Sequence, residues 1–140
     1  MKLLPYLNFN GTCKEAIVFY EKVFNAKAEI LLYEDMPKFD KSMPVPKGKE
    51  KWVMHANMNL PDGVMIQFAD CEDNAKVMST NICLQLTFKT ADEIKEIYAA
   101  LKDDGKILCE CQPTFYAPLY AEVVDKFGVR WSIMQESPEA

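Results

Sequence analysis

The chain of 140 residues repeats one order of elements twice, and this repeat constrains its fold more than any other feature. In each half, an alternating segment precedes a helical pattern, and three more alternating segments follow. Both helical patterns begin at the spacing of a capping box, Thr12 with Glu15 and Thr90 with Glu93. A repeat of about 78 residues is too long for a solenoid unit, so it indicates duplication within one domain.

The first half reads as a strand, a helix and three further strands. After Thr12, apolar side chains recur three and four residues apart, as in an amphipathic helix that ends at Asn25. Pro-Asp-Gly at 61–63 is typical of a hairpin turn. The predicted elements are a strand at 2–10, a helix at 13–24, a strand at 26–35, a proline- and lysine-rich loop at 36–49, and strands at 51–60 and 64–70.

The second half repeats this order. Thr90 opens its helix, and Gly105 is predicted to end it. The predicted elements are a strand at 81–88, a helix at 91–105, strands at 106–112, 119–125 and 129–135, and a tight turn at 126–128.

Strand alternation predicts two unlike faces for each sheet. The strand at 51–60 separates an apolar set, Trp52, Met54, Ala56, Met58 and Leu60, from a polar set, His55, Asn57 and Asn59. The helix of each half covers the apolar face, so the other half has to cover the polar face. Two curved sheets that face each other leave a cleft for a small ligand.

The predicted fold class is therefore α+β, with two tandem β-α-β-β-β modules that form a curved, cleft-bearing mixed sheet. Residues 1–140 are predicted to be a single domain, with module one at about 1–70 and module two at about 80–136.

Composition excludes several classes of partner. The net charge is −5 and no basic stripe is present, so nucleic acid is not expected to bind. The apolar run at the N-terminus is too short for a signal sequence or a membrane span. Five cysteines, an odd number, argue against a disulfide framework, so we expect a cytoplasmic protein with reduced thiols.

Three stretches carry a resemblance to a known family. They are "PYLNFNGTCKEAIVFYEKVFNA", "VMHANMNL" with "VMIQFAD", and "TFYAPLYAEVVDKFGVRWSI". They resemble the vicinal-oxygen-chelate superfamily of glyoxalase I, bleomycin-resistance proteins and extradiol dioxygenases, and most closely its PhnB-like branch. The resemblance implies the glyoxalase/bleomycin-resistance fold and a homodimer, whose interface the loop at 36–49 is long enough to reach.

The same resemblance implies positions for a divalent metal in the cleft. Carried over to this chain, they are Pro5, Gln67, Cys83 and Ser132. Proline has no ligating atom, and an amide, a thiol and a hydroxyl are a poor set for metals that prefer imidazoles and carboxylates. We therefore predict no metal and no cofactor. Some relatives carry a methyltransferase label, but this chain has no glycine-rich strand-to-helix loop for a nucleotide-like cofactor.

Three titratable residues are candidates for chemistry, each with a structural alternative. His55, the single histidine, suits acid–base work or hydrogen bonding to a ligand, or else a structural hydrogen bond. Cys83 is a nucleophile only if a base activates it, and otherwise a small buried thiol. Glu122 is a proton acceptor if its surroundings are dry, and otherwise an exposed carboxylate.

Aromatic residues of the second half form another candidate set. Phe115, Tyr116, Tyr120 and Trp131 line an apolar pocket or else pack the module. Cys109 and Cys111 lie on one side of a strand and match neither a redox nor a zinc motif.

Three functions follow, and whether the protein is an enzyme stays open. The first is metal-free binding of a small apolar or aromatic molecule in the cleft between the modules. The second is a lyase, isomerase or dioxygenase with an atypical divalent-metal site, or a metal-free enzyme. The third is a structural or regulatory dimer. No catalytic residue is assigned. The predicted cleft residues are His55, Asn57, Gln67, Cys83, Gln85, Phe115, Tyr116, Tyr120, Glu122 and Ser132.

Overall fold

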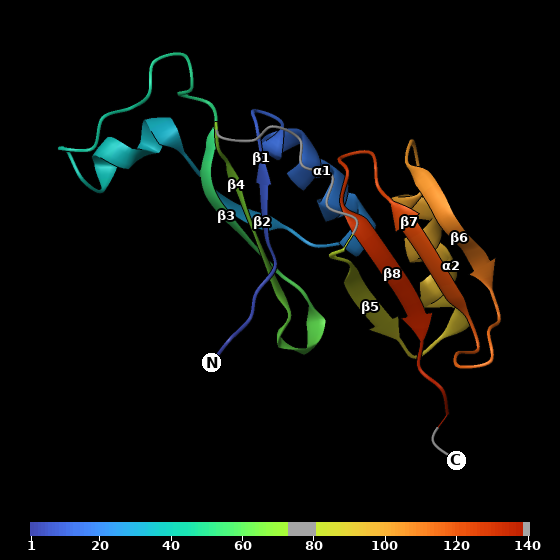
Figure 1. Cartoon of the computed structure of the whole chain (residues 1–140). Helices are drawn as coiled ribbons and strands as arrows, with labels where there is room; N and C mark the ends of the chain where they lie inside the picture. The colour runs from blue at the N-terminus through green and yellow to red at the C-terminus, as the bar shows by residue number, and fades with distance from the viewer. Residues whose placement is uncertain (73–80, 139–140) are drawn as a thin grey trace. The chain divides into compact units, whose positions relative to one another are not determined.

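The computed structural model describes residues 1–72 and 81–138, in two compact units, Met1–Lys76 and Val77–Ala140. Each unit has one helix and one four-stranded mixed sheet, and the predicted order β-α-β-β-β is confirmed in both (Figure 1). The predicted α+β class with two modules is therefore correct. That both modules form a single domain stays a prediction.

The first unit contains a sheet of order β1-β4-β3-β2, in which β1 runs parallel to β4 and the other pairs are antiparallel. Its elements are β1 (Tyr6–Phe9), α1 (Cys13–Phe24), β2 (Ala28–Leu32), the 3₁₀ helix η1 (Tyr33–Lys38), β3 (Val53–Asn59), the 3₁₀ turn η2 (Pro61–Gly63) and β4 (Met65–Asp70).

The second unit repeats this topology in the order β5-β8-β7-β6, with β5 parallel to β8. Helix α2 lies against one face of its sheet (Figure 1). The elements are β5 (Leu84–Phe88), α2 (Ala91–Leu101), β6 (Lys106–Gln112), β7 (Tyr120–Val124) and β8 (Arg130–Gln135).

The core of each unit lies between its helix and one face of its sheet. In the first unit the Tyr20 ring stacks on Phe68 with centroids 5.8 Å apart. In the second unit Trp131 is 1% exposed and donates from Nε1 to the Asp125 carboxylate at 2.8 Å. Since burying one large side chain stabilises a fold by about 1.5–3 kcal/mol, these helix-covered faces hold the units together.

One core prediction is wrong by a residue. Val53 is fully buried, whereas Met54 is only half-buried. The pairing of β2 with β3 shifts between Leu31 and Leu32, and a shift of one residue exchanges the faces of a strand. Ala56 and Met58, beyond the shift, are buried as predicted.

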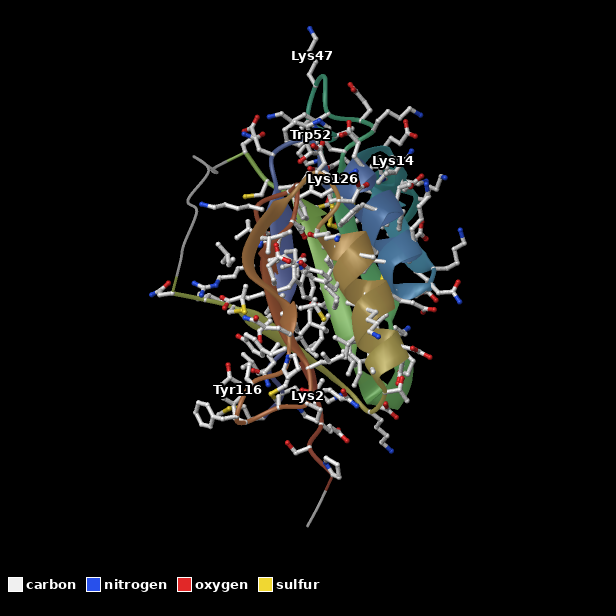
Figure 2. The ribbon with its side chains drawn as sticks, turned by 90° about the vertical axis from the view of Figure 1, so that its right-hand side faces the viewer. Lys2, Lys14, Lys47, Trp52, Tyr116 and Lys126 are labelled. Atoms are coloured by element: carbon white, nitrogen blue, oxygen red, sulfur yellow. The ribbon has the colours of Figure 1, made fainter. Side chains whose placement is uncertain are left out.

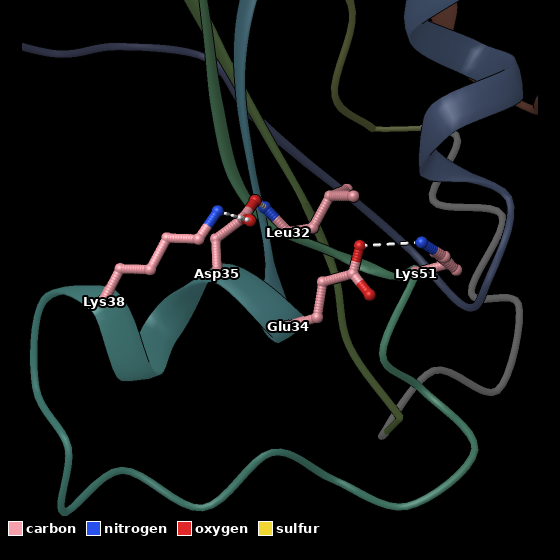
Figure 3. Close-up of polar contacts among 5 residues, drawn as sticks. All are labelled: Leu32, Glu34, Asp35, Lys38 and Lys51. Carbon is pink, nitrogen blue, oxygen red and sulfur yellow. Dashed lines mark hydrogen bonds and ion pairs between the residues drawn. The ribbon is translucent and has the colours of Figure 1, made fainter.

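The second strand ends three residues earlier than predicted, because the chain turns into η1 at Tyr33. The Asp35 carboxylate accepts a hydrogen bond from the Leu32 backbone N–H at 3.1 Å and pairs with Lys38 at 3.0 Å (Figure 3). The adjacent Glu34 pairs with Lys51 at 2.7 Å. These local carboxylate contacts stabilise a helical turn where the residue pattern alone favoured a strand.

The two predicted capping boxes have different outcomes. Thr90 accepts from the backbone N–H of Glu93 at 3.2 Å, as predicted. Thr12 makes no capping hydrogen bond. Instead, the buried carboxylate of Asp70 in β4 accepts from the backbone N–H groups of Gly11 and Cys13, at 2.8 and 3.1 Å. Asp70, which is 59 and 57 residues away from these two donors, thus holds the start of α1 in place of the predicted Thr12 cap.

The predicted hairpin at 61–63 is confirmed. Leu60 donates its backbone N–H to Val64 at 2.8 Å, and Asp62 and Gly63 have φ angles of 62° and 74°. Positive φ at two successive positions is the geometry that favours Asp-Gly in tight turns.

Gly105 has a different role from the predicted helix stop. Helix α2 ends at Leu101, and the left-handed residue is Asp104, with φ of 56°. A Cβ on Gly105 would lie 2.5 Å from the Val124 carbonyl oxygen. Glycine is therefore required here for close approach to β7.

No helix in the described part of the chain is long and apolar enough to cross a membrane.

Candidate ligand-binding faces

Each sheet has one face that its helix does not cover, and most of the predicted site residues lie on these two faces. Because side chains alternate along a strand, His55 and Asn57 point away from the buried Ala56 and Met58. The first polar face consists of Tyr6, His55, Asn57 and Gln67, and the second polar face of Cys83, Gln85, Tyr120, Glu122, Arg130 and Ser132.

The two faces have equivalent positions in register. In the first unit, Gln67 of β4 lies opposite Asn57 of β3 and Tyr6 of β1. In the second, Ser132 of β8 lies opposite Glu122 of β7 and Gln85 of β5. Counting two residues back along β3 and β7 makes Tyr120 the equivalent of His55. That the two faces meet in one cleft stays a prediction.

A chain of hydrogen bonds joins the first polar face. The Tyr6 hydroxyl lies 3.0 Å from Nδ1 of His55, and Nε2 of His55 lies 2.9 Å from Oδ1 of Asn57. Gln67 donates to the same Asn57 oxygen at 3.3 Å. Three residues that the sequence predicted separately, His55, Asn57 and Gln67, therefore form one network, and Tyr6 completes it.

An ion pair dominates the second polar face. Arg130 donates from Nε and Nη2 to Oε1 of Glu122, and this hydrogen bond raises the pKa of Arg130. Tyr120 donates to the other Glu122 oxygen at 3.3 Å and accepts from the Ser132 hydroxyl at 3.2 Å. Glu122 therefore serves as an acceptor for two neighbours, and the dry, unpaired carboxylate needed for the proton-acceptor hypothesis is not found.

Cys83 precedes β5 and lies near this ion pair. Partial burial of the thiol, and next the charge of Glu122, raise its pKa, whereas Arg130 has the opposite effect. A nucleophilic cysteine needs a thiolate, so the surroundings of Cys83 disfavour that role. Cys109 and Cys111 are half-buried free thiols.

The predicted aromatic set divides between the two sides of the sheet. Trp131 packs in the core, on the side of α2, which settles its alternative in favour of packing. Phe115 and Tyr116 lie on the loop between β6 and β7 and are 100% and 49% exposed. The position of Tyr116 is labelled in Figure 2. Their rings meet edge to face at 4.9 Å, and Tyr116 meets Tyr120 in the same way at 5.6 Å.

The positions that the resemblance suggested for a metal do not form a ligand set. Gln67 and Ser132 occupy equivalent positions, but Pro5 and Cys83 precede their strands, so Tyr6 and Gln85 take the paired positions. Among residues 1–72 and 81–138, no three His, Cys, Asp or Glu side chains are grouped to hold a metal ion. That the protein works without a metal or cofactor stays a prediction.

Sequence reasoning missed two residues of these faces, Tyr6 and Arg130. Arg130 lies two residues before Ser132 on β8, so alternation places it on the predicted face. Tyr6 was not among the predicted cleft residues. Tyr6 and Asn8 lie two residues apart in β1 and therefore share one face of the strand. This pairing with a polar residue was the available signal for a hydrogen-bonding role.

Comparison with known proteins gives the family. A family model described as 3-demethylubiquinone-9 3-methyltransferase matches residues 1–134. The chain belongs to this PhnB-like family. Protein YjdN of Escherichia coli (strain K12) is 34% identical over 142 residues, covering 95% of this chain and 94% of that protein. The predicted resemblance to the PhnB-like branch is confirmed.

Solved structures similar to this family member agree. The PhnB protein from Bacillus cereus is 28% identical, with a TM-score of 0.75 over 97% of this chain and 100% of that chain. Protein PA1353 from Pseudomonas aeruginosa is 24% identical, with a TM-score of 0.81 over 99% of both chains.

A more distant structure connects the family with the superfamily fold. The glyoxylase/bleomycin resistance protein/dioxygenase domain from Frankia sp. EAN1pec is 11% identical, with a TM-score of 0.63 over 98% of both chains. At this identity the likeness concerns the fold alone, and it confirms the glyoxalase-like fold.

Proposed function

We propose that this PhnB-like protein binds a small apolar or aromatic molecule, without a metal, at the second polar face and the aromatic rings beside it. One observation carries the proposal. The edge-to-face series Phe115–Tyr116–Tyr120 continues directly into the hydrogen-bonded group of Tyr120, Ser132 and Glu122. Apolar rings next to a few oriented polar groups are the usual composition of a small-molecule site.

The exposure of the rings supports binding over packing. A fully exposed Phe115 gains nothing from burial in this chain, and its area becomes favourable only when another molecule covers it. Tyr120 has a different role, because its hydroxyl is held by Ser132 and Glu122 and presents a fixed polar group beside the rings.

Methyl transfer is not proposed, although the family description carries that name. The five glycines, at 11, 48, 63, 105 and 128, stand far apart and form no glycine-rich loop between a strand and a helix. Such a loop is what lets a backbone approach a nucleotide-like cofactor closely.

The binding proposal is tested with the fluorescent aromatic probe 8-anilinonaphthalene-1-sulfonate. Since aromatic contacts contribute about 0.5–1.5 kcal/mol each, Phe115→Ala should weaken probe binding roughly two- to tenfold. The matched control is Phe39→Ala in the first unit, because Phe39 is also exposed, at 74%. Equal effects of the two substitutions, or none from Phe115→Ala, would contradict the proposal.

The remaining functions are separated by two measurements. Stoichiometric nickel, zinc, manganese or iron in the purified protein would favour the divalent-metal enzyme instead. Failure of the native protein to bind any aromatic probe would favour the structural or regulatory role. The homodimer also stays a prediction, which the molar mass from light scattering tests directly.

A further inference from the structure

The hydrogen-bond network of the first polar face has a definite direction, and Met65 determines it. A thioether sulfur accepts hydrogen bonds and never donates them. Gln67 Nε2 lies 3.9 Å from the Met65 sulfur, so the amide of Gln67 is oriented with its NH₂ group toward Met65 and Asn57. Asn57 therefore presents its oxygen, an acceptor, to both Gln67 and His55.

The orientation of Asn57 then selects the tautomer of His55. Because Asn57 Oδ1 can only accept, His55 must carry its proton on Nε2 to make the 2.9 Å contact. In the neutral ring, Nδ1 is then an acceptor, and the Tyr6 hydroxyl donates to it at 3.0 Å. Partial burial raises the pKa of Tyr6, so the phenol keeps the proton that it donates.

This leaves the Tyr6 oxygen with acceptor capacity only. Its single proton points to His55, and among the residues that the structure describes its hydroxyl has no other hydrogen-bond partner. Tyr6 is 43% exposed, so the unused lone pairs are within reach of a molecule outside the sheet.

We propose that Tyr6 and His55 form a hydrogen-bond acceptor site for a ligand that carries a hydroxyl or N–H group, and that protonation of His55 converts it into a donor site. In the imidazolium form Nδ1 carries a proton, which it donates to the Tyr6 oxygen. The Tyr6 proton then turns outward, and the site selects a ligand with an acceptor oxygen instead. The residues of this site all belong to the first unit, so its argument does not rest on the proposed function of the second polar face.

The groups around His55 are compatible with this change. On β4, Gln67 opposite Asn57 and Met65 opposite Asn59 are uncharged, and on β1 the hydrogen-bonded neighbour of His55 is Tyr6. On β2 Glu29 lies opposite Asn57, and Tyr33 beyond the strand interacts with Tyr6. Glu29 is thus the charged group that β2 contributes to this face.

The first test uses the fact that the chain has a single histidine, so its ring nitrogens give one set of ¹⁵N signals. At about pH 8, where histidines are normally neutral, we expect Nε2 protonated and Nδ1 unprotonated. Tyr6→Phe should reduce this tautomer preference, and Tyr33→Phe should leave it unchanged. A proton on Nδ1 at that pH would reverse the network and overturn the proposal.

The second test compares p-cresol with 4-methylanisole, in which a methyl group replaces the hydroxyl proton. One net hydrogen bond contributes about 0.5–1.5 kcal/mol to binding. At about pH 8, p-cresol should therefore bind roughly two- to tenfold more tightly than 4-methylanisole. Binding is measured by the shift of the His55 signals. At about pH 5 the preference should decrease or reverse.

Equal affinities at both pH values, or no shift of the His55 signals with either compound, would overturn the proposal. Since the readout is the histidine itself, this result is scored separately from binding of the fluorescent probe at Phe115.

Discussion

The two polar faces occupy equivalent positions in a duplicated topology, yet their chemistry differs. The first has neutral partners, His55, Asn57 and Gln67, and the second has the charged pair Glu122 and Arg130. The strand register is the same, so the backbone sets where side chains are presented but not what they do. The difference teaches that a duplicated fold can hold a hydrogen-bond network in one half and an ion pair in the other.

The largest expected effect concerns Asp70, the buried aspartate of the first unit. Asp70 accepts from three backbone N–H groups, those of Gly11, Cys13 and Val53. Asp70→Ala leaves these donors unsatisfied and should lower the free energy of unfolding by about 3 kcal/mol, as measured by urea denaturation. The control is Asp40→Ala on the exposed loop, and a comparable loss in both variants would contradict this role.

The next effect tests the charged character of the second face through the reactivity of Cys83. The charge of Glu122 raises the pKa of this thiol, so Glu122→Gln should lower it and increase the thiolate fraction near neutral pH. Alkylation of Cys83 by iodoacetamide should accelerate roughly threefold, measured by peptide mass spectrometry.

The fully buried Cys13 is the internal reference for this experiment. Burial keeps the reagent away from its thiol and also raises the pKa of that thiol, and each of these effects slows alkylation. An unchanged Cys83 rate in the Glu122→Gln variant would show that the carboxylate does not act on this thiol.

A smaller effect is expected when the first face receives a negative charge at Asn57, the position equivalent to Glu122 in the second face. Asn57→Asp places a carboxylate beside Nε2 of His55, and an opposite charge favours the imidazolium. Relative to the wild type, the midpoint of the histidine signals, followed by NMR, should move to higher pH. Stabilisation by the new pair should be present at acidic pH and lost as pH rises through that midpoint. Asn59→Asp, on the same strand, is the control.

The smallest effect on stability is expected for His55→Ala. His55 is half-buried and its bonds join side chains on an uncovered face, so the thermal midpoint should change by only about a degree or two. Binding of p-cresol at about pH 8 should weaken roughly two- to tenfold, because this variant removes the ring that orients the Tyr6 hydroxyl. A variant that binds p-cresol as tightly as the wild type would give His55 a purely structural role.

Much of the fold was predictable because its signals are local. The Thr90 capping box, the turn at 61–63 and the alternation of β5 and β8 involve residues within a few positions of one another. The same kind of signal failed at Thr12, where a carboxylate from β4 reaches the helix start, and at Met54, where the shift between β2 and β3 exchanges the faces.

The sequence by itself determined the duplicated order of elements, most members of the two polar faces and the family. Only the tertiary structure decided that His55 bonds to Tyr6 across 49 residues, that Glu122 is paired with Arg130, and that Trp131 belongs to the core. The physical reason is that periodicity assigns a side chain to a face, whereas its partners depend on strand order and register. Both are long-range properties that emerge when the sheets form.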